Sequence, residues 1–302
     1  MASVGLAIPT AAPDVQPNTA VEFARRAEAA GAGSVWVMDR LVFSNYDPLV
    51  TLGALTAVTN RVRLGTCVLL ATLRPPALLA KMLGSLDRMS GGRLVVGIGV
   101  GSRPDDFAAA GTPWEHRGGR AEELVQILRL AWSGQPVRFA GTHYRIDVGP
   151  IGPTPAQAHI PIWFGGSAES AMRRIARIGD GYIGSSSGGP AGFRERWQQI
   201  QRYAEKTGRD PASITPAALV YACVDDDRSR AEELARAYFS HYYGPGRREI
   251  TGYMLGPADD CVRVAESYFE AGVDTLIVGS VTADIRYFER LCADVLPRLG
   301  GR

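Results

Sequence analysis

Apolar residues along this chain fall into two alternating patterns. Short runs rich in Val, Leu and Ile, such as those at 63–69 and 94–98, show almost no polar alternation. Such runs are typical of parallel strands that are buried on both faces. Between these two runs, Leu79, Leu83 and Leu86 recur at helical spacing. The segment 61–101 therefore predicts a strand–helix–strand unit.

The same alternation continues through most of the chain. We expect strands at 4–8, 35–38, 63–69, 94–98, 160–164, 181–183, 217–224 and 275–278. Helices are expected at 19–30, 49–59, 78–86, 118–132, 168–178, 191–207, 228–239, 258–271 and 285–296, the second capped by Asp47 with Pro48 at its first position. The segment 137–146 resembles an inserted hairpin, and 241–255 reads as irregular. The pattern predicts an α/β fold over 1–302, a single-domain (β/α)8 TIM barrel with short insertions; a doubly wound open sheet is the alternative.

Composition narrows the class of protein. With 46% hydrophobic and 21% charged residues and a net charge of +2, the chain has no electrostatic reason to bind nucleic acid or an anionic membrane. We find no signal peptide pattern and no apolar stretch of the roughly 18 residues that a membrane span needs. The four cysteines are far apart, which predicts free thiols and a cytoplasmic location. The dispersed histidines predict no metal site.

Six motifs resemble the signatures of one family. They read WVMDRL, RVRLGTCV, RPPALLAK, LDRMSGGRLVVGIGVG, PIWFGGS and GDGYIGSS, in this order along the chain. They are similar to those of the bacterial luciferase-like oxidoreductases. The resemblance implies a (β/α)8 barrel that uses coenzyme F420, a deazaflavin, or a reduced flavin such as FMN. It also implies a homodimer.

The end of the second strand carries two charged residues, Asp39 and Arg40. They could form an ion pair that closes the barrel rim. In the F420-using relatives this position is typically Asp-His, so the resemblance implies that Asp39 lies near the cofactor ring. Arg40 departs from that pattern, because a guanidinium stabilises an anion but cannot shuttle a proton near neutral pH. Tyr46, His116 and a water molecule are the candidate proton donors in its place.

Strand three ends at Thr66, Cys67 and Val68. The resemblance implies a cis peptide bond between Cys67 and Val68 that supports the back of the cofactor ring. Both could instead be ordinary buried strand residues. A redox role for Cys67 is disfavoured, since no basic partner is evident in the sequence.

After the fourth strand, Gly99 and Gly101 would let the backbone approach a flat ligand, although such glycines commonly mark a tight turn. Ser102 and Asp105 follow and would lie over the edge of that ligand. Ser102 stands where some relatives carry a catalytic Glu, which weakens the analogy to the sugar-phosphate dehydrogenases of the family.

The predicted phosphate site combines two turns. Gly165, Gly166 and Ser167 end strand five and open a helix, whose free amides and dipole attract an anion. Ser185 and Ser186 follow strand six and would supply hydroxyl donors beside it. Both segments could also be simple glycine turns with capping serines.

Two further segments are candidates for substrate selection, pocket lids or oligomer contacts, although each could also be an ordinary surface loop. The residues concerned are Arg138, His143, Tyr144, Tyr242, Tyr243 and Tyr253. We expect an oxidoreductase that uses F420 for hydride transfer to or from a small organic substrate. The alternatives are an FMN-dependent monooxygenase with a flavin reductase partner, a cofactor-free barrel that binds a phosphorylated metabolite, and a non-catalytic flavin-binding protein.

Overall fold

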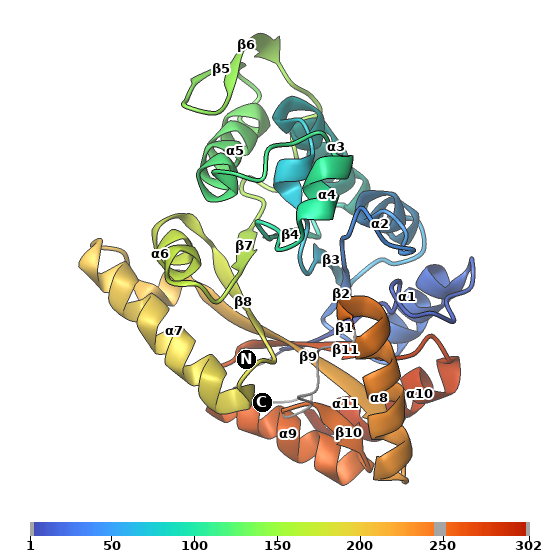
Figure 1. Cartoon of the computed structure of the whole chain (residues 1–302). Helices are drawn as coiled ribbons and strands as arrows, with labels where there is room; N and C mark the ends of the chain where they lie inside the picture. Colours follow the sequence, from blue (N-terminus) through green and yellow to red (C-terminus); the bar gives the residue numbers. More distant parts are fainter. Residues whose placement is uncertain (1–2, 245–251, 300–302) are drawn as a thin grey trace.

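Eight parallel strands close into a barrel in the computed structural model, which describes residues 3–244 and 252–299 (Figure 1). They are β1 (Ser3–Ala7), β2 (Ser34–Val37), β3 (Arg63–Thr66), β4 (Leu94–Ile98), β7 (Ile162–Gly165), β8 (Gly181–Ser185), β9 (Thr215–Val224) and β11 (Thr275–Ser280). The ring closes because β8 pairs with β9 and β11 pairs with β1. The predicted barrel is confirmed, and the open sheet is excluded.

Helices surround this barrel (Figure 1). They are α1 (Thr19–Ala29), α2 (Pro48–Thr56), α3 (Pro76–Ser90), α5 (Arg117–Trp132), α6 (Glu169–Ile178), α7 (Gly189–Lys206), α8 (Arg228–Tyr243), α9 (Ala258–Glu270), α10 (Ile285–Arg290) and α11 (Leu296–Leu299). The predicted cap is confirmed, since an Asp47 carboxylate oxygen accepts hydrogen bonds from the amides of Leu49 and Val50. Across 3–244 and 252–299, none of the helices is both long and apolar enough to cross a bilayer.

Several elements differ from their predicted form. A short helix, α4 (Pro104–Ala109), occupies the polar run after strand four. The last predicted helix is interrupted by a π-helical turn at Leu291–Val295. The segment 241–255 is not wholly irregular, because α8 extends to Tyr243 and β10 (Met254–Gly256) pairs with β9; the stretch 245–251 lies outside the described residues. The predicted hairpin is confirmed as β5 (Pro136–Ala140) and β6 (Arg145–Pro150).

Two aromatic rings close the lower part of the barrel interior. Trp36 and Trp163 lie with ring centroids 5.3 Å apart, and both are buried. They fit because neighbouring strands carry glycines: a Cβ on Gly65 would lie 2.3 Å from the Trp36 ring, and one on Gly181 would lie 2.5 Å from Trp163.

Candidate active site

A cavity of about 700 Å³ opens at the carboxyl ends of the barrel strands. Most of the predicted site residues line it together: Asp39, Arg40, Cys67, Val68, Gly99, Gly101, Ser102, His116, Gly165, Gly166, Ser167 and Ser185. They come from five strands and the loops that follow them, at the face of the barrel where active sites of this fold lie. The residues described in the structure include no cluster of His, Cys, Asp or Glu that could hold a metal ion.

The back of the cavity is built around Val68. The peptide bond between Cys67 and Val68 is cis, as predicted. A Cβ on Gly99 would lie 2.5 Å from a methyl group of Val68, and one on Gly165 would lie 3.0 Å from the other. Because Gly99 and Gly165 have no side chains, the Val68 side chain fits against both of them. The Val68 side chain can therefore form a surface for a flat ligand. Burial raises the pKa of the Cys67 thiol to about 12, so the thiol stays protonated.

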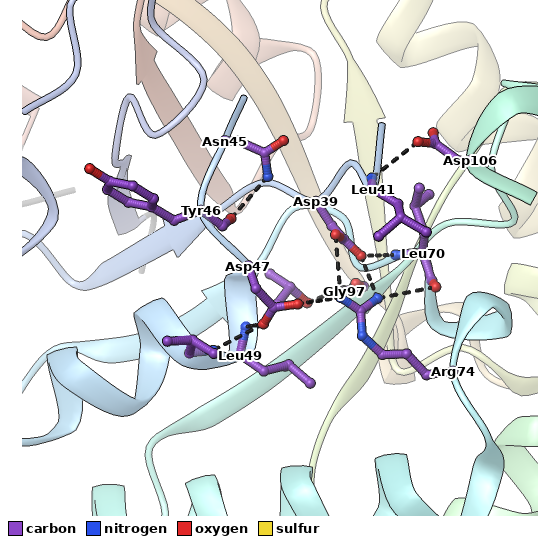
Figure 2. A network of polar contacts seen from close by, with 12 residues as sticks. Asp39, Leu41, Asn45, Tyr46, Asp47, Leu49, Leu70, Arg74, Gly97 and Asp106 are labelled. Atoms are coloured by element: carbon purple, nitrogen blue, oxygen red, sulfur yellow. Dashed lines mark hydrogen bonds and ion pairs between the residues drawn. The ribbon is translucent and has the colours of Figure 1, made fainter. Parts of the chain in front are cut away.

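Asp39 forms an ion pair at the rim, but its partner is Arg74 (Figure 2). The Asp39 side chain is buried, with the residue 6% exposed. Its Oδ2 accepts a hydrogen bond from the Leu70 amide at 2.9 Å and one from Arg74 Nη1 at 2.7 Å. Arg74 Nη2 also reaches Asp47 Oδ2 at 2.8 Å. The idea that Asp39 pairs with Arg40 is wrong, because Arg74 from the loop after strand three occupies that place.

Arg40 instead ties the loop after β2 to other elements. Its guanidinium donates to the carbonyl oxygens of Tyr242 at 3.2 Å and Val42 at 3.1 Å, and it lies over the Phe43 ring at 4.7 Å. Its Nε is 3.9 Å from an Asp106 carboxylate oxygen. The Arg40 guanidinium is therefore already bound by carbonyl oxygens and a carboxylate of the protein. Through Tyr242, Arg40 holds the end of α8 over the cavity.

The predicted phosphate end contains a buried arginine. Gly166 has a φ of 142°, and a Cβ there would lie 2.7 Å from Ala171, so glycine is required at this turn. Arg174, one turn further along α6, lines the cavity and is 6% exposed. Its Nε lies 3.3 Å from Glu122. Burial, only partly offset by Glu122, lowers the pKa of Arg174.

Three tyrosines cover the other side of the cavity. Tyr221, Tyr242 and Tyr243 line it, and the hydroxyls of Tyr221 and Tyr243 are 2.8 Å apart. Burial and the neighbouring Tyr243 raise the pKa of Tyr221 well above its usual value, so it remains a neutral hydrogen-bond donor. Tyr253 packs instead against Phe239, with ring centroids 4.8 Å apart.

Four predicted residues do not line this cavity. Tyr46 is 37% exposed, and its ring points away from Asp39 (Figure 2). Thr66 is fully buried and donates to the Gly97 carbonyl, because strand alternation turns it away from the interior. Ser186 is buried and is not part of the cavity wall. Asp105 is half exposed, with a carboxylate oxygen 3.8 Å from Arg40.

His116 lines the cavity at the start of α5, where its φ of 55° is left-handed. Its ring stacks on His143 with centroids 5.7 Å apart, which joins the cavity to the turn of the inserted hairpin. Arg138 lies away from it on the hairpin and pairs with Asp147 in solvent.

Four further residues line the cavity although no sequence motif pointed to them: Arg103, Arg117, Arg174 and Tyr221. One signal for Arg174 was present in the sequence. It lies between Ala171 and Ile175 on the buried stripe of α6, where a charged residue is unusual.

Comparison with known proteins agrees with this geometry. A family model described as luciferase-like monooxygenase matches residues 3–275. An F420-dependent glucose-6-phosphate dehydrogenase from Nakamurella multipartita is 33% identical over 231 residues, which cover 73% of this chain and 68% of that protein. A monooxygenase from Streptomyces bottropensis shares the fold with a TM-score of 0.85 and 21% identity, over 99% of this chain and 100% of that one.

An F420-dependent secondary alcohol dehydrogenase, solved with an F420–acetone adduct, has a TM-score of 0.84 and 22% identity, over 97% of this chain and 98% of that one. At these identities the two solved structures confirm the fold alone. The family model spans nearly the whole barrel and the cavity at its mouth, from β1 to the start of β11. The chain belongs to the luciferase-like monooxygenase family, as its motifs predicted.

Proposed function

We propose that this protein is an oxidoreductase that uses coenzyme F420 in hydride transfer to or from a small organic substrate. The buried guanidinium of Arg174 carries the proposal, because it lines the same cavity as the Gly166 turn and adds a positive charge to a site with an amide-rich helix start. Relatives named as F420-dependent glucose-6-phosphate dehydrogenase and as 5,10-methylenetetrahydromethanopterin reductase support this branch of the family.

The residues present fit a flavin-type cofactor. Val68 and its flanking glycines offer a surface for a planar ring, and Asp39 lies at the adjoining edge. Gly165, Gly166 and Ser167, with Ser185 and Arg174, would hold a phosphate. When bound, the deazaflavin supplies or accepts the hydride, and the protein orients the two reactants.

Proton handling rests on the titratable side chains of the cavity. Arg40 cannot exchange a proton near neutral pH, and its guanidinium is engaged by backbone carbonyls. His116 lines the cavity and is the proposed proton carrier, whereas Tyr46 lies outside it. A direct hydrogen bond from Arg74 fixes the orientation of the Asp39 carboxylate at the proposed cofactor edge.

An FMN-dependent monooxygenase with a separate reductase is the second candidate, supported by the family description and by the fold shared with a monooxygenase. F420 is favoured because Asp39 occupies the position that the resemblance assigns to the deazaflavin ring. We also propose that the chain forms a single domain and a homodimer.

A titration of the purified protein with F420 and with FMN, followed by fluorescence, tests the proposal. We expect micromolar binding of F420 and weaker binding of FMN. Arg174→Gln should weaken F420 binding about 10- to 100-fold, the value of a charged hydrogen bond. Arg173→Gln is the matched control, since its neighbouring guanidinium is exposed and pairs with Glu169.

Two outcomes would contradict the proposal. Preference for FMN would favour the monooxygenase, and binding of neither would favour the cofactor-free barrel. Asp39→Asn separates an enzyme from a non-catalytic binding protein, because the enzyme should lose turnover while it still binds F420.

A further inference from the structure

The wall of the cavity at the barrel mouth carries more positive than negative side chains. Among the described residues it includes the carboxylates of Asp39 and Asp106 and the guanidinium groups of Arg40, Arg103, Arg117 and Arg174. Most of these charges are paired: Asp39 with Arg74, Asp106 with Arg40, and Arg174 with Glu122. Arg103 and Arg117 remain. Within 3–244 and 252–299, neither has a carboxylate oxygen within 4.0 Å of its guanidinium nitrogens.

Arg117 lies over an indole ring. Its guanidinium carbon is 3.7 Å from the centre of the Trp114 ring. Its Nε and Nη1 donate long hydrogen bonds to the carbonyl oxygens of Gly101 at 3.3 Å and Trp114 at 3.4 Å. Its Nη2 has no acceptor in the described part of the chain, and this atom is open to solvent. A positioned guanidinium therefore keeps an accessible donor.

Arg103 is fixed from the tyrosine side of the same cavity. Its Nη2 donates to the Tyr242 carbonyl at 2.8 Å, which ties the loop after β4 to the end of α8. Its Nε and Nη1 have no acceptor among residues 3–244 and 252–299, and both atoms are open to solvent. The neighbouring Asp105 has a carboxylate oxygen 3.8 Å from Arg40. Arg103 therefore also keeps donors that a ligand can reach.

The two arginines belong to one edge of the cavity. Arg117 binds the carbonyl of Gly101, and Arg103 follows Gly101 in the same loop. Two unpaired positive charges in one cavity attract an anion. Guanidinium groups bind carboxylate and phosphate oxygens by charged hydrogen bonds, often two at a time. Leu70 and Leu219 also line the cavity, which suits a ligand with an apolar body.

We propose that the substrate of this protein carries a carboxylate or phosphate group, which Arg103 and Arg117 hold at the cavity mouth. The identification of this ligand as the substrate rests on the proposed function, in which the cofactor ring lies against Val68 and its phosphate lies at the Gly166 turn with Arg174. That arrangement leaves Arg103 and Arg117 for the second reactant. The anion site itself can be measured without the cofactor.

Calorimetric titration with phenylacetate, with phenyl phosphate and with the neutral phenylacetamide, at constant ionic strength, tests this site. The two anions distinguish the head groups, and the amide has the same apolar body without the charge. We expect at least one anion to bind about tenfold more tightly than the amide, in the protein alone and in the protein saturated with F420. Arg103→Gln and Arg117→Gln should each weaken anion binding about tenfold, since Gln keeps a hydrogen-bond donor but lacks the charge.

The two substitutions are made separately, so either one decides the question if the other variant does not fold. Arg138→Gln, on the exposed hairpin, and Arg174→Gln, at the proposed phosphate site, are the controls and should bind the anions as the unchanged protein does. The affinity for F420 should stay unchanged in Arg103→Gln and Arg117→Gln.

Four results would overturn the proposal. They are anions that bind no more tightly than phenylacetamide, anion binding that both Gln variants retain in full, anion binding that disappears with Arg174→Gln, and a loss of F420 affinity in Arg103→Gln and Arg117→Gln. The last result would assign the two arginines to the cofactor. Failure of the proposed function is a different result: a protein that binds neither F420 nor FMN, but binds the anions through Arg103 and Arg117, would contradict that function and confirm the anion site.

Discussion

Arg74 Nη1 lies 2.7 Å from Asp39 Oδ2, and this contact joins the loop after β3 to the end of β2. The same guanidinium binds Asp47, the cap of α2. Burial alone would lower the pKa of Arg74, but the hydrogen bonds to the two carboxylates outweigh it and raise that pKa. One side chain therefore holds an active-site carboxylate and the start of a helix in a fixed arrangement.

Removal of this arginine should destabilise the protein. Arg74→Met leaves the buried Asp39 carboxylate without its counter-ion, which we expect to lower the free energy of unfolding by about 3 kcal/mol. Urea denaturation at pH 7 measures the effect. Arg138→Met removes an exposed ion pair and should cost less than about 0.5 kcal/mol. If Arg74→Met lowered the free energy of unfolding by less than about 1 kcal/mol, the ion pair between Arg74 and Asp39 would not be important for stability.

Asp47 should make stability depend on pH in the acid range. Burial would raise its pKa, but hydrogen bonds from the Val50 amide and Arg74 outweigh burial and lower it. A depressed pKa contributes stability above the unfolded value near pH 4, and this contribution is lost as the pH falls through the folded value. Asp47→Ala should cost about 1 kcal/mol at pH 7.

The gap in unfolding free energy between Asp47→Ala and the unchanged protein should narrow when urea denaturation is repeated from pH 5 to pH 3. Asp147→Ala, on the exposed hairpin, is the control and should show little effect at any pH. A gap that stayed constant or widened in acid would refute the assignment.

The cysteines should resist alkylation while the protein is folded. Burial raises the pKa of Cys67, Cys223 and Cys261 to about 12 and that of Cys292 to about 11. At pH 8 only about one thiol in a thousand or fewer is then a thiolate, the reactive form. Mass spectrometry after iodoacetamide treatment should find little modification in buffer and all four sites modified in urea. Rapid labelling of Cys67 in the folded protein would contradict this prediction and would support a role for Cys67 as a nucleophile.

Gly166→Ala should damage the cofactor phosphate site selectively. The left-handed φ and the close Ala171 side chain leave no room for a Cβ, so the turn must shift. We expect F420 affinity to fall at least tenfold in a fluorescence titration. Gly208 also has a positive φ, but nothing lies within 4 Å of an added Cβ there. Gly208→Ala is therefore the control and should leave F420 affinity unchanged. Equal affinity in both variants would show that the Gly166 turn does not hold the phosphate.

The barrel was predictable because buried parallel strands and amphipathic helices leave different hydrophobic periods in a sequence. The eight strands were found, with ends displaced by one to three residues, most of all at the end of β3. Helix α4 was missed because its six residues are too short to show a helical period. The π-helical turn in the last helix has no sequence pattern that distinguishes it from α-helix.

The site was only partly predictable, because motifs locate backbone turns better than side-chain directions. Gly165, Gly166 and Ser167 fall where expected, whereas Thr66 and Ser186, from two of the other motifs, are buried and do not line the cavity. Arg74 and Arg174 contribute through tertiary contacts with Asp39 and Glu122 that lie far away in the sequence. Nothing in the local sequence reveals such partners.

The paired tryptophans below the cavity bear on the order of events during turnover. Trp36 and Trp163 precede the cavity-lining residues on β2 and β7 and are packed together, so we expect ligands that meet at Val68 to enter and leave through the mouth. A ring lying against Val68 is then covered by whatever binds above it. In a cavity with one opening, the cofactor must then bind before the substrate and leave after the product. Steady-state kinetics should therefore show compulsory ordered binding with the cofactor first.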